Sequence, residues 1–218
     1  MSSSKGLSGE AYEKFKQGLL NRDITLGATM SQSELAEILS VSLGPLRNAL
    51  KLLEAEGFLE ILPRSGIRIA EPDIDLVKNC YQLRRIIEQP ALEKFAEHTS
   101  RQELEAVKAV HLEILSEVMG RSELSSGLFE RARTIDTGFH RQMVASLDNP
   151  IIDSIYQTNH QRALLIRLRK RKDTVAFVIT TFEEHLRIID ALLESDTDRA
   201  AAALNQHLDK AIQRALGF

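Results

Sequence analysis

The chain has 218 residues, of which 43 % are hydrophobic and 27 % are charged. This composition is typical of a globular protein that buries a core, in one large domain or two small ones. The formal net charge of -3 excludes a globally basic protein that coats nucleic acid without specificity, but it leaves room for a local basic face.

Cysteine usage and hydropathy bear on the compartment. The single cysteine, Cys80, excludes an intrachain disulfide, and it lies in an apolar-periodic stretch where we expect a buried thiol. Residues 1–10 lack the apolar segment of a signal peptide, and no apolar run approaches the roughly 18 residues of a membrane span. We therefore expect a cytoplasmic protein with no membrane partner.

The N-terminal part of the chain begins with a segment predicted to be disordered and then two helices. Residues 1–9 are rich in serine and glycine, and apolar residues at helical spacing follow over residues 10–21. Ser31 and Glu34 have the spacing of a capping box, which predicts that a second helix begins there. The intervening stretch, with Gly27, is predicted to be a turn.

A third helix and a hairpin complete this part. Ser42 is the expected N-cap of the third helix, Pro45 is tolerated in its first turn, and Gly57 is a typical stop. Two short strands are predicted around a turn at 63–66. Two helices joined by a tight turn and followed by a hairpin predict a winged helix-turn-helix domain over residues 10–71.

The remainder, residues 72–218, is predicted to be an all-α antiparallel bundle. Pro72 marks the boundary, and a helical period continues to the end of the chain. Six helices are predicted, near 74–98, 101–119, 126–147, 150–170, 174–194 and 196–216. The predicted fold class is therefore mainly α.

The N-terminal domain is predicted to bind operator DNA. In such domains the second helix of the motif enters the major groove, while the wing contacts phosphates. Residues 1–70 contain eight basic and eight acidic side chains, a balance of 8 − 8 = 0. DNA affinity must then come from the placement of charges and from dimerisation.

This pattern resembles the GntR family of transcriptional regulators. The residues that carry the resemblance are Gly27, Glu34-Leu35-Ala36, Val41-Ser42, Pro45, Arg47, Ala49-Leu50, Glu56-Gly57 and Gly66. The resemblance implies that Arg47 lies on the face of the recognition helix that meets DNA, although it could also be a plain surface arginine. The implied DNA-binding residues are Ser33, Ser42, Leu43, Gly44, Arg47, Arg64 and Gly66.

The chain departs from the family pattern where bases are read. Leu43, Gly44 and Ser33 stand where the family usually has arginine, threonine and arginine, and the basic residue of the wing, Arg64, is displaced by one position. Leu43 cannot hydrogen-bond a base edge, but it could contact a thymine methyl group or pack against the wing. We expect an unusual operator, or weaker base readout with more reliance on DNA shape.

Four residues in the C-terminal domain predict a metal site. Asp136 and His140 are four apart and share a helix face, while His185 and His207 lie on two later helices. Three imidazoles and a carboxylate suit a divalent cation, zinc foremost, with nickel, manganese or iron as alternatives. The other interpretation is a polar network in the core.

The helical domain resembles the FCD effector domain of the FadR subfamily. The residues that carry this resemblance are Arg84 with Ile87-Glu88, Asp136 with Phe139-His140, Asn149-Pro150, Glu184-His185 and His207-Leu208. Six predicted helices rather than seven resemble the VanR-type branch. The resemblance implies that residues 72–218 bind an effector and form a dimer, and that the effector is a small carboxylate bound at the metal.

Two arginines are candidates for holding that effector. A guanidinium beside a cation can bind a carboxylate through two parallel hydrogen bonds, and Arg84 is the first candidate. The alternative for Arg84 is a salt bridge with Glu88 at i+4. Arg133, one turn before Asp136, is the second candidate, and His111 could face either the pocket or solvent.

The combined prediction is a homodimeric DNA-binding regulator, a repressor in the first instance, controlled by a small organic acid at a metal centre. A metal sensor in which the cation itself is the effector is the alternative, although Cys80 is the only soft ligand. A metallohydrolase using Glu183 or Glu184 is a remote alternative, because a DNA-binding domain has no role in such an enzyme. The basic run at 167–173 is predicted to complement the end of a helix.

Overall fold

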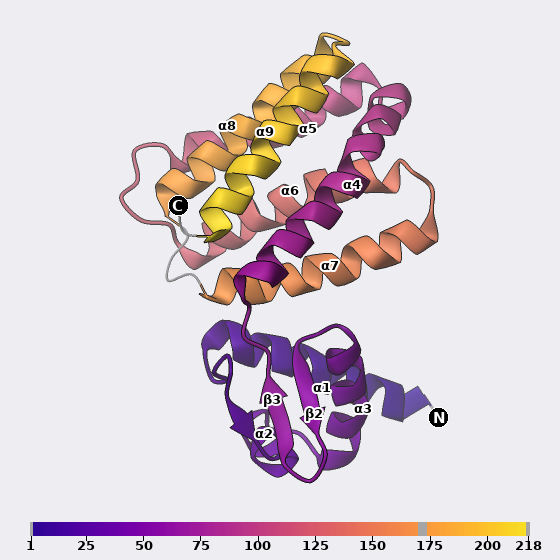
Figure 1. The fold of residues 1–218 in the computed structure, drawn as a ribbon. Coiled ribbons are helices and arrows are strands. Elements are labelled where there is room, and N and C mark those ends of the chain that lie inside the picture. Colours follow the sequence, from indigo (N-terminus) through magenta and orange to yellow (C-terminus); the bar gives the residue numbers. More distant parts are fainter. Residues whose placement is uncertain (1, 170–173, 217–218) are drawn as a thin grey trace. The chain divides into compact units, whose positions relative to one another are not determined.

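The computed structural model describes residues 2–169 and 174–216 (Figure 1). The chain divides into two compact units, Met1–Leu76 with His160–Lys170 and Val77–Asn159 with Arg171–Phe218. The division lies a few residues beyond the predicted boundary at 71/72. The side chains of the basic run at 167–173 fall outside the described part of the chain.

The first unit contains three helices and a small sheet. Its elements are α1 (Ser2–Asn21), β1 (Thr29–Met30), α2 (Gln32–Ile38), α3 (Leu43–Ala55), β2 (Leu59–Leu62) and β3 (Gly66–Ile69). The predicted capping box is present, because the Ser31 hydroxyl accepts from the Glu34 N–H and the Glu34 carboxylate accepts from the Ser31 N–H. Ser42 is the N-cap residue of α3, but its side chain makes no capping hydrogen bond.

Residues 2–9, within the segment predicted to be disordered, lie in α1, which begins at Ser2 in the structure. The helix is anchored by Ala11, Phe15 and Leu19, which are buried. Once these turns have formed, each further residue adds a hydrogen bond without a new nucleation cost. The serine- and glycine-rich composition therefore did not prevent helix formation.

The sheet has the strand order β1-β3-β2, and both pairings are antiparallel. The β2–β3 hairpin was predicted, whereas β1 lies in a stretch predicted to be a turn. A strand of two residues is too short to show the alternation that identifies strands from sequence. Strand β1 forms only when the unit folds and β3 lies beside it, with Met30 opposite Ile67.

The core of this unit is built from one face of each helix and the inner face of the sheet. Phe15 of α1 and Phe58 before β2 meet edge to face, with ring centroids 6.2 Å apart. Leu165 of α7 is buried in the same cluster. The described C-terminal part of α7 thus contributes to the N-terminal unit, which no local pattern predicted.

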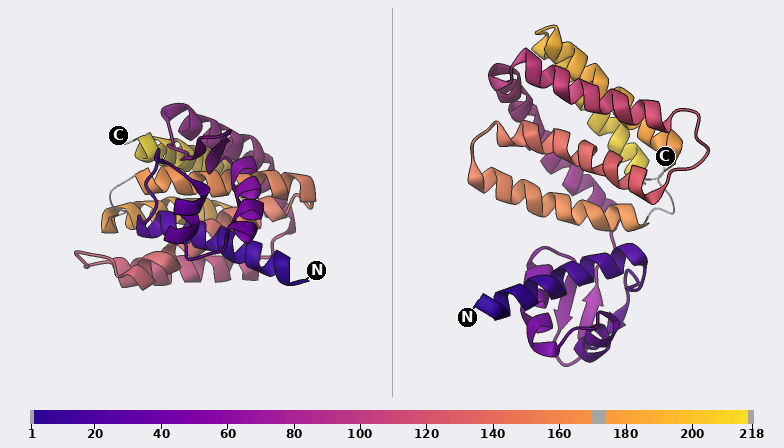
Figure 2. Two further views of the ribbon diagram at one scale, coloured as in Figure 1. Left: turned by 90° about the horizontal axis from the view of Figure 1, so that it is seen from below. Right: turned by 180° about the vertical axis from the view of Figure 1, so that it is seen from behind.

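The second unit is helical, and its described residues form six helices as predicted. They are α4 (Ile74–His98), α5 (Arg101–Val118), α6 (Ser126–Ala145), α7 (Pro150–Arg169), α8 (Val175–Leu193) and α9 (Thr197–Leu216). Helix α8 packs along both α9 and α5, as the view from behind in Figure 2 shows. The predicted mainly α fold, a winged helix-turn-helix followed by a helical bundle, is confirmed.

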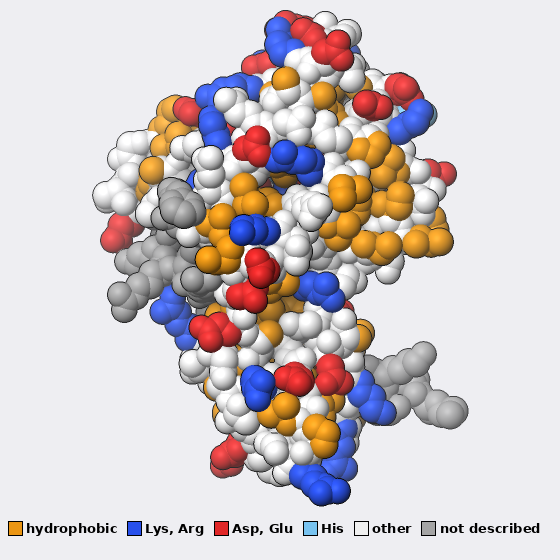
Figure 3. All heavy atoms as spheres, in the orientation of Figure 1, with side chains coloured by type: hydrophobic (Ala, Val, Ile, Leu, Met, Phe, Trp, Pro, Cys, Tyr) orange, Lys and Arg blue, Asp and Glu red, His pale blue; other side chains and the backbone are white. Residues whose placement is uncertain are grey.

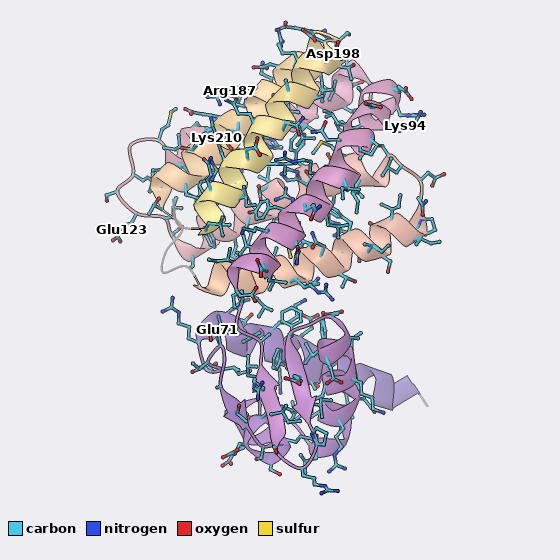
Figure 4. All side chains as sticks on the ribbon, in the orientation of Figure 1. Glu71, Lys94, Glu123, Arg187, Asp198 and Lys210 are labelled. Atoms are coloured by element: carbon cyan, nitrogen blue, oxygen red, sulfur yellow. The ribbon has the colours of Figure 1, made fainter. Side chains whose placement is uncertain are left out.

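Two buried clusters hold these helices together, and side chains fill the space between them (Figure 4). One is centred on α4, α6, α8 and α9, with Leu92, Met143, Ile188 and Leu204 fully buried. The other joins α5, α6 and α8 through residues such as Ile114 and Phe182. Along α8, His185 lies between residues of the two clusters, after Phe182 and before Ile188.

The surface of the helical unit carries both charged and apolar side chains (Figure 3). Ile86 of α4 and Ile151 and Ile155 of α7 are among its exposed large apolar residues. Within the described ranges, no helix has the length and hydropathy needed to cross a lipid bilayer.

Candidate functional site

Three histidines from three helices meet in the interior of the helical unit. His140 of α6, His185 of α8 and His207 of α9 are all buried. One ring nitrogen of each lies within 4.8 Å of the corresponding nitrogens of the other two. The structure therefore brings together the three imidazoles that the sequence predicted as metal ligands.

Asp136 lies at the edge of this group. Its carboxylate oxygen Oδ1 is 3.6 Å from Nε2 of His185, and its side chain is 25 % exposed. Asp136 precedes His140 by one helical turn, so both side chains lie on the same side of α6. A carboxylate here can offset part of the charge of a cation held by the histidines.

The Nδ1 atom of His140 donates to a buried carboxylate. Its acceptor is Glu88 Oε2 of α4, at 2.9 Å. The other oxygen of Glu88 accepts from Tyr156 Oη and Arg84 Nε, each at 2.7 Å. Burial would raise the pKa of Glu88, but Arg84 and His140 outweigh it and hold the pKa well below its usual range.

The Nδ1 atom of His207 is held in the same way by a second glutamate. It donates to Glu184 Oε2 of α8 at 2.9 Å, and Arg214 of α9 donates to both oxygens of Glu184 at 2.8 Å. Lys210 lies 3.8 Å from this carboxylate. Burial opposes ionisation of Glu184, but the hydrogen bonds from Arg214 and His207 lower its pKa to about 2.

His185 is held by another imidazole. Its Nδ1 lies 3.2 Å from Nε2 of His111 on α5, and His111 Nδ1 lies 2.7 Å from the carbonyl oxygen of Val107. Of the two orientations open to His111, the structure thus selects the interior. Burial lowers the pKa of His185 well below its ordinary value, and it lowers the pKa of His207 to about 4.

These contacts leave the inner nitrogens of two histidines without a hydrogen-bond partner. Nε2 of His140 and Nε2 of His185 are buried and make no hydrogen bond. A buried polar atom without a partner normally costs free energy. In a neutral imidazole, an Nδ1 that donates a proton leaves an unprotonated Nε2, whose lone pair suits a divalent cation.

The two arginines predicted to hold an effector make other contacts. Arg84 forms the salt bridge with Glu88 that was its alternative interpretation, and its side chain is 17 % exposed. Arg133 donates twice to Glu130, one turn earlier on α6. The structure therefore places Arg84 next to the group that supports His140, and it pairs Arg133 with a neighbour on its own helix.

Most of the groups that support the histidines carry no local signal in the sequence. Glu184 is adjacent to His185 in sequence but serves His207, which no spacing rule predicts. Tyr156 and Arg214 reach their carboxylates across the bundle, from 68 and 30 residues away. Only the i, i+4 spacing of Arg84 and Glu88 was a usable local signal.

The predicted DNA-contacting residues lie in the first unit, and all but one are exposed. The exposed ones are Ser33, Ser42, Leu43, Gly44, Arg47 and Arg64. Leu43 at the start of α3 is 37 % exposed, so it does not pack into the core of this unit. Arg47 donates through Nε to Gln32 Oε1 at 3.2 Å, which links α3 to the start of α2.

Gly66, the remaining predicted DNA-binding residue, lies where the backbone of β1 leaves no room for a side chain. Its φ is +100°, and a Cβ atom at this position would lie 2.3 Å from the carbonyl oxygen of Met30. Only glycine avoids that contact, because the backbone of β1 passes directly over it. Gly66 thus shapes the sheet on which Arg64 is carried.

Comparisons with known proteins agree with this architecture. The sequence profile of the FCD domain matches residues 79–210, and that of bacterial regulatory proteins of the gntR family matches residues 7–69. The Nta operon transcriptional regulator of Aminobacter aminovorans is 28 % identical over 184 residues, covering 84 % of this chain and 82 % of that protein.

Two further proteins are similar over most of their length. The HTH-type transcriptional repressor NanR of Escherichia coli strain K12 is 26 % identical, with 94 % of this chain and 82 % of that protein covered. The crystal structure of a putative transcriptional regulator GntR from Rhodococcus sp. RHA1 shares the fold, with a TM-score of 0.74, 19 % identity, and 100 % and 99 % of the two chains covered. The chain therefore belongs to the GntR family of transcriptional regulators and carries an FCD domain.

Proposed function

We propose that this regulator holds a divalent cation at Asp136, His140, His185 and His207, and that a small carboxylate bound there controls its affinity for operator DNA. Zinc is the first candidate, with nickel, manganese or iron as alternatives. The observation that carries the proposal is the direction of the hydrogen bonds. Each Nδ1 is occupied by an acceptor, so the unprotonated nitrogens face a common centre.

The balance of charges around the proposed cation site supports a carboxylate effector. Glu88 is neutralised by Arg84, and Glu184 is neutralised by Arg214. Asp136 is then the anion that faces the cation directly, so a bound divalent ion would keep a residual positive charge. An anionic ligand would complete both the charge balance and the coordination.

Arg84 and Arg133 are each already paired with a glutamate, which limits how either could bind an effector. A carboxylate held by Arg84 would have to share the guanidinium with Glu88, which Arg84 already contacts at 2.7 Å. Arg84 then acts on the centre by fixing Glu88 and, through it, His140. Arg133 could reach an effector only by giving up its contacts with Glu130.

For the DNA-binding unit, we propose that α3 enters the major groove of an operator with two half-sites. The exposed Arg47 is the candidate for a base or phosphate contact, and the uncapped Ser42 hydroxyl is available to a phosphate. Leu43 would meet a thymine methyl group. Arg64 at the wing would contact the DNA backbone.

A homodimer that acts as a repressor is the form we propose for the molecule. Exposed Ile86, Ile151 and Ile155 on the helical unit offer apolar surface that association could cover. The relative named as a repressor supports the direction of regulation. The six helices among the described residues of the effector unit favour the VanR-like branch of the family.

The first test is the metal content of purified protein, measured by plasma mass spectrometry beside an Asp136→Ala/His140→Ala variant. About one zinc, nickel, manganese or iron ion per chain in the parent and none in the variant is the expected result. An absence of metal, with none regained on titration, would reduce the cluster to a polar core network.

Binding to DNA then separates the two regulatory schemes. Operator affinity is measured for the metal-loaded protein with and without a panel of small carboxylates. Release of DNA by a carboxylate at constant metal supports the proposal. If the affinity for operator DNA instead changes only with the metal concentration and does not respond to carboxylates, the cation itself is the effector.

A further inference from the structure

The three imidazoles at the centre are not supported alike. His140 and His207 each donate through Nδ1 to a glutamate, at 2.9 Å in both cases. His185 faces the neutral side chain of His111 instead, at 3.2 Å. The difference lies in the chemistry of the acceptor, because all three rings are buried.

The Val107 carbonyl, which His111 contacts, determines where the protons of His111 and His185 lie. The Val107 carbonyl oxygen can only accept, so Nδ1 of His111 must donate to it. A neutral imidazole that donates at one nitrogen accepts at the other, so Nε2 of His111 accepts from Nδ1 of His185. Nε2 of His185 is left with its lone pair, on the side where Asp136 lies at 3.6 Å.

Aromatic rings enclose the two histidines. Phe139 of α6 lies 5.3 Å from His111 and 5.0 Å from His185, measured between ring centroids. Phe182 of α8 lies 5.1 Å and 5.9 Å from the same two rings. With both imidazoles at most 1 % exposed, water does not replace the acceptor that His111 provides.

This enclosure also explains why the acceptor is neutral. Glu88 and Glu184 are each balanced by an arginine that contacts them directly. A carboxylate placed between Phe139 and Phe182 would have two aromatic neighbours and a neighbouring carboxylate at Asp136, which would make its ionisation costly. An imidazole accepts the same hydrogen bond without bringing a charge into this side of the bundle.

We propose that His111 is a positioning residue that holds His185 in the Nδ1-protonated tautomer and in the ring orientation needed to bind a cation. The inference rests on the proposed metal centre, and it adds a residue that does not touch the cation. Without His111, the Nδ1 proton of His185 would be buried without an acceptor. His185 would then gain by protonating Nε2 instead, which removes its lone pair from the centre.

The test compares metal binding by the full-length chain and three variants. His111→Leu fills a similar space without an acceptor, and His111→Gln can accept from His185 and donate to Val107. Ile114→Ala damages the core one turn further along α5, where Ile114 is fully buried, without removing a polar contact. Zinc affinity is measured by competition with a chelating dye, and the visible spectrum of added cobalt reports the ligand field.

We expect His111→Leu to weaken zinc binding by roughly 10- to 100-fold and to shift the cobalt bands. His111→Gln should restore most of the affinity and the parent spectrum, while Ile114→Ala should keep both. Parent-like binding by His111→Leu would overturn the inference, as would equal losses in all three variants. A parent chain that binds neither metal would instead overturn the metal centre itself.

Nitrogen NMR of the metal-free parent gives a test that needs no variant. The chemical shifts of imidazole nitrogens distinguish a protonated from an unprotonated site. The expected result is protonation at Nδ1 and not at Nε2 in both His111 and His185. The reverse tautomer at His185 would contradict the inference even if a variant failed to fold.

Discussion

At the scale of single residues, burial and hydrogen bonding determine what each histidine can do. His185 and His207 both have lowered pKa values, because burial penalises the imidazolium form; nearby basic groups lower the pKa of His185 further, whereas the hydrogen bond to Glu184 only partly opposes the shift at His207. A neutral imidazole is the form that binds a metal ion. The same environment therefore serves metal binding and makes the metal-free chain sensitive to acid.

The first prediction concerns this sensitivity. Unfolded His207 takes up a proton below its ordinary pKa of 6.5, whereas the folded residue does so only near pH 4. Since the unfolded state binds more protons in this window, the stability of the metal-free chain should fall as the pH falls from 6.5 to 4. The contribution of His207 to this loss is at most about 3 kcal/mol.

Urea unfolding of chelator-treated protein at several pH values measures the effect. His207→Leu should flatten the dependence on pH, while Leu204→Ala on the same helix should lower stability by a similar amount at every pH. A parent chain whose stability is constant between pH 6.5 and 4 would show that burial does not hold His207 neutral.

At the scale of secondary structure elements, local signals predicted the helices well. Helical spacing of apolar residues placed α4 to α9 within a few residues of their observed ends, and the Ser31–Glu34 capping box marked the start of α2. Strand β1 was missed because its two residues pair with β3 only in the folded unit. Helix α1 includes the serine- and glycine-rich residues 2–9, and its buried residues Phe15 and Leu19 lie farther along the same helix.

Gly66 links the wing to β1, and its replacement tests that link. Gly66→Ala should destabilise the first unit by about 2 kcal/mol or more, because the residue has a positive φ and the added carbon would collide with the Met30 carbonyl. Chemical denaturation of the full chain provides the measurement. Gly44→Ala is the control, since a Cβ atom there meets nothing within 4 Å; equal stability of the two variants would contradict the assigned contact.

At the scale of the whole molecule, the affinity of the proposed dimer for operator DNA should depend on the spacing between the two half-sites. A symmetric pair of recognition helices requires half-sites about one helical turn apart, or a multiple of it. With an operator selected from random-sequence DNA, inserting roughly 5 bp between the half-sites should weaken binding by roughly 10²-fold or more. Equal affinity for both spacings would mean that each chain binds DNA alone.

Arg47→Ala serves as the companion variant in this experiment. It should weaken binding to both spacings by about 1–3 kcal/mol at fixed salt concentration, because a contact on α3 is made in each half-site regardless of spacing. The two effects therefore separate recognition within a half-site from the geometry of the dimer.

The amino-acid sequence by itself determined the kinds of element and the kinds of ligand. Helical period, caps and stop residues act over a few positions, so they can be read without the fold. The i, i+4 spacing of Asp136 and His140 is equally local, and so is that of Arg84 and Glu88. These signals sufficed to identify the family resemblance and the residues that could hold a cation.

Only the tertiary structure decided how each imidazole is supported. The pairs His140–Glu88, His207–Glu184 and His185–His111 join residues 52, 23 and 74 positions apart. Whether such a partner is charged or neutral depends on which helices pack together and on what else is buried there. The packing of Leu165 with the N-terminal unit was decided in the same way. Contacts between distant residues are set by the closing of the core, and no local pattern encodes them.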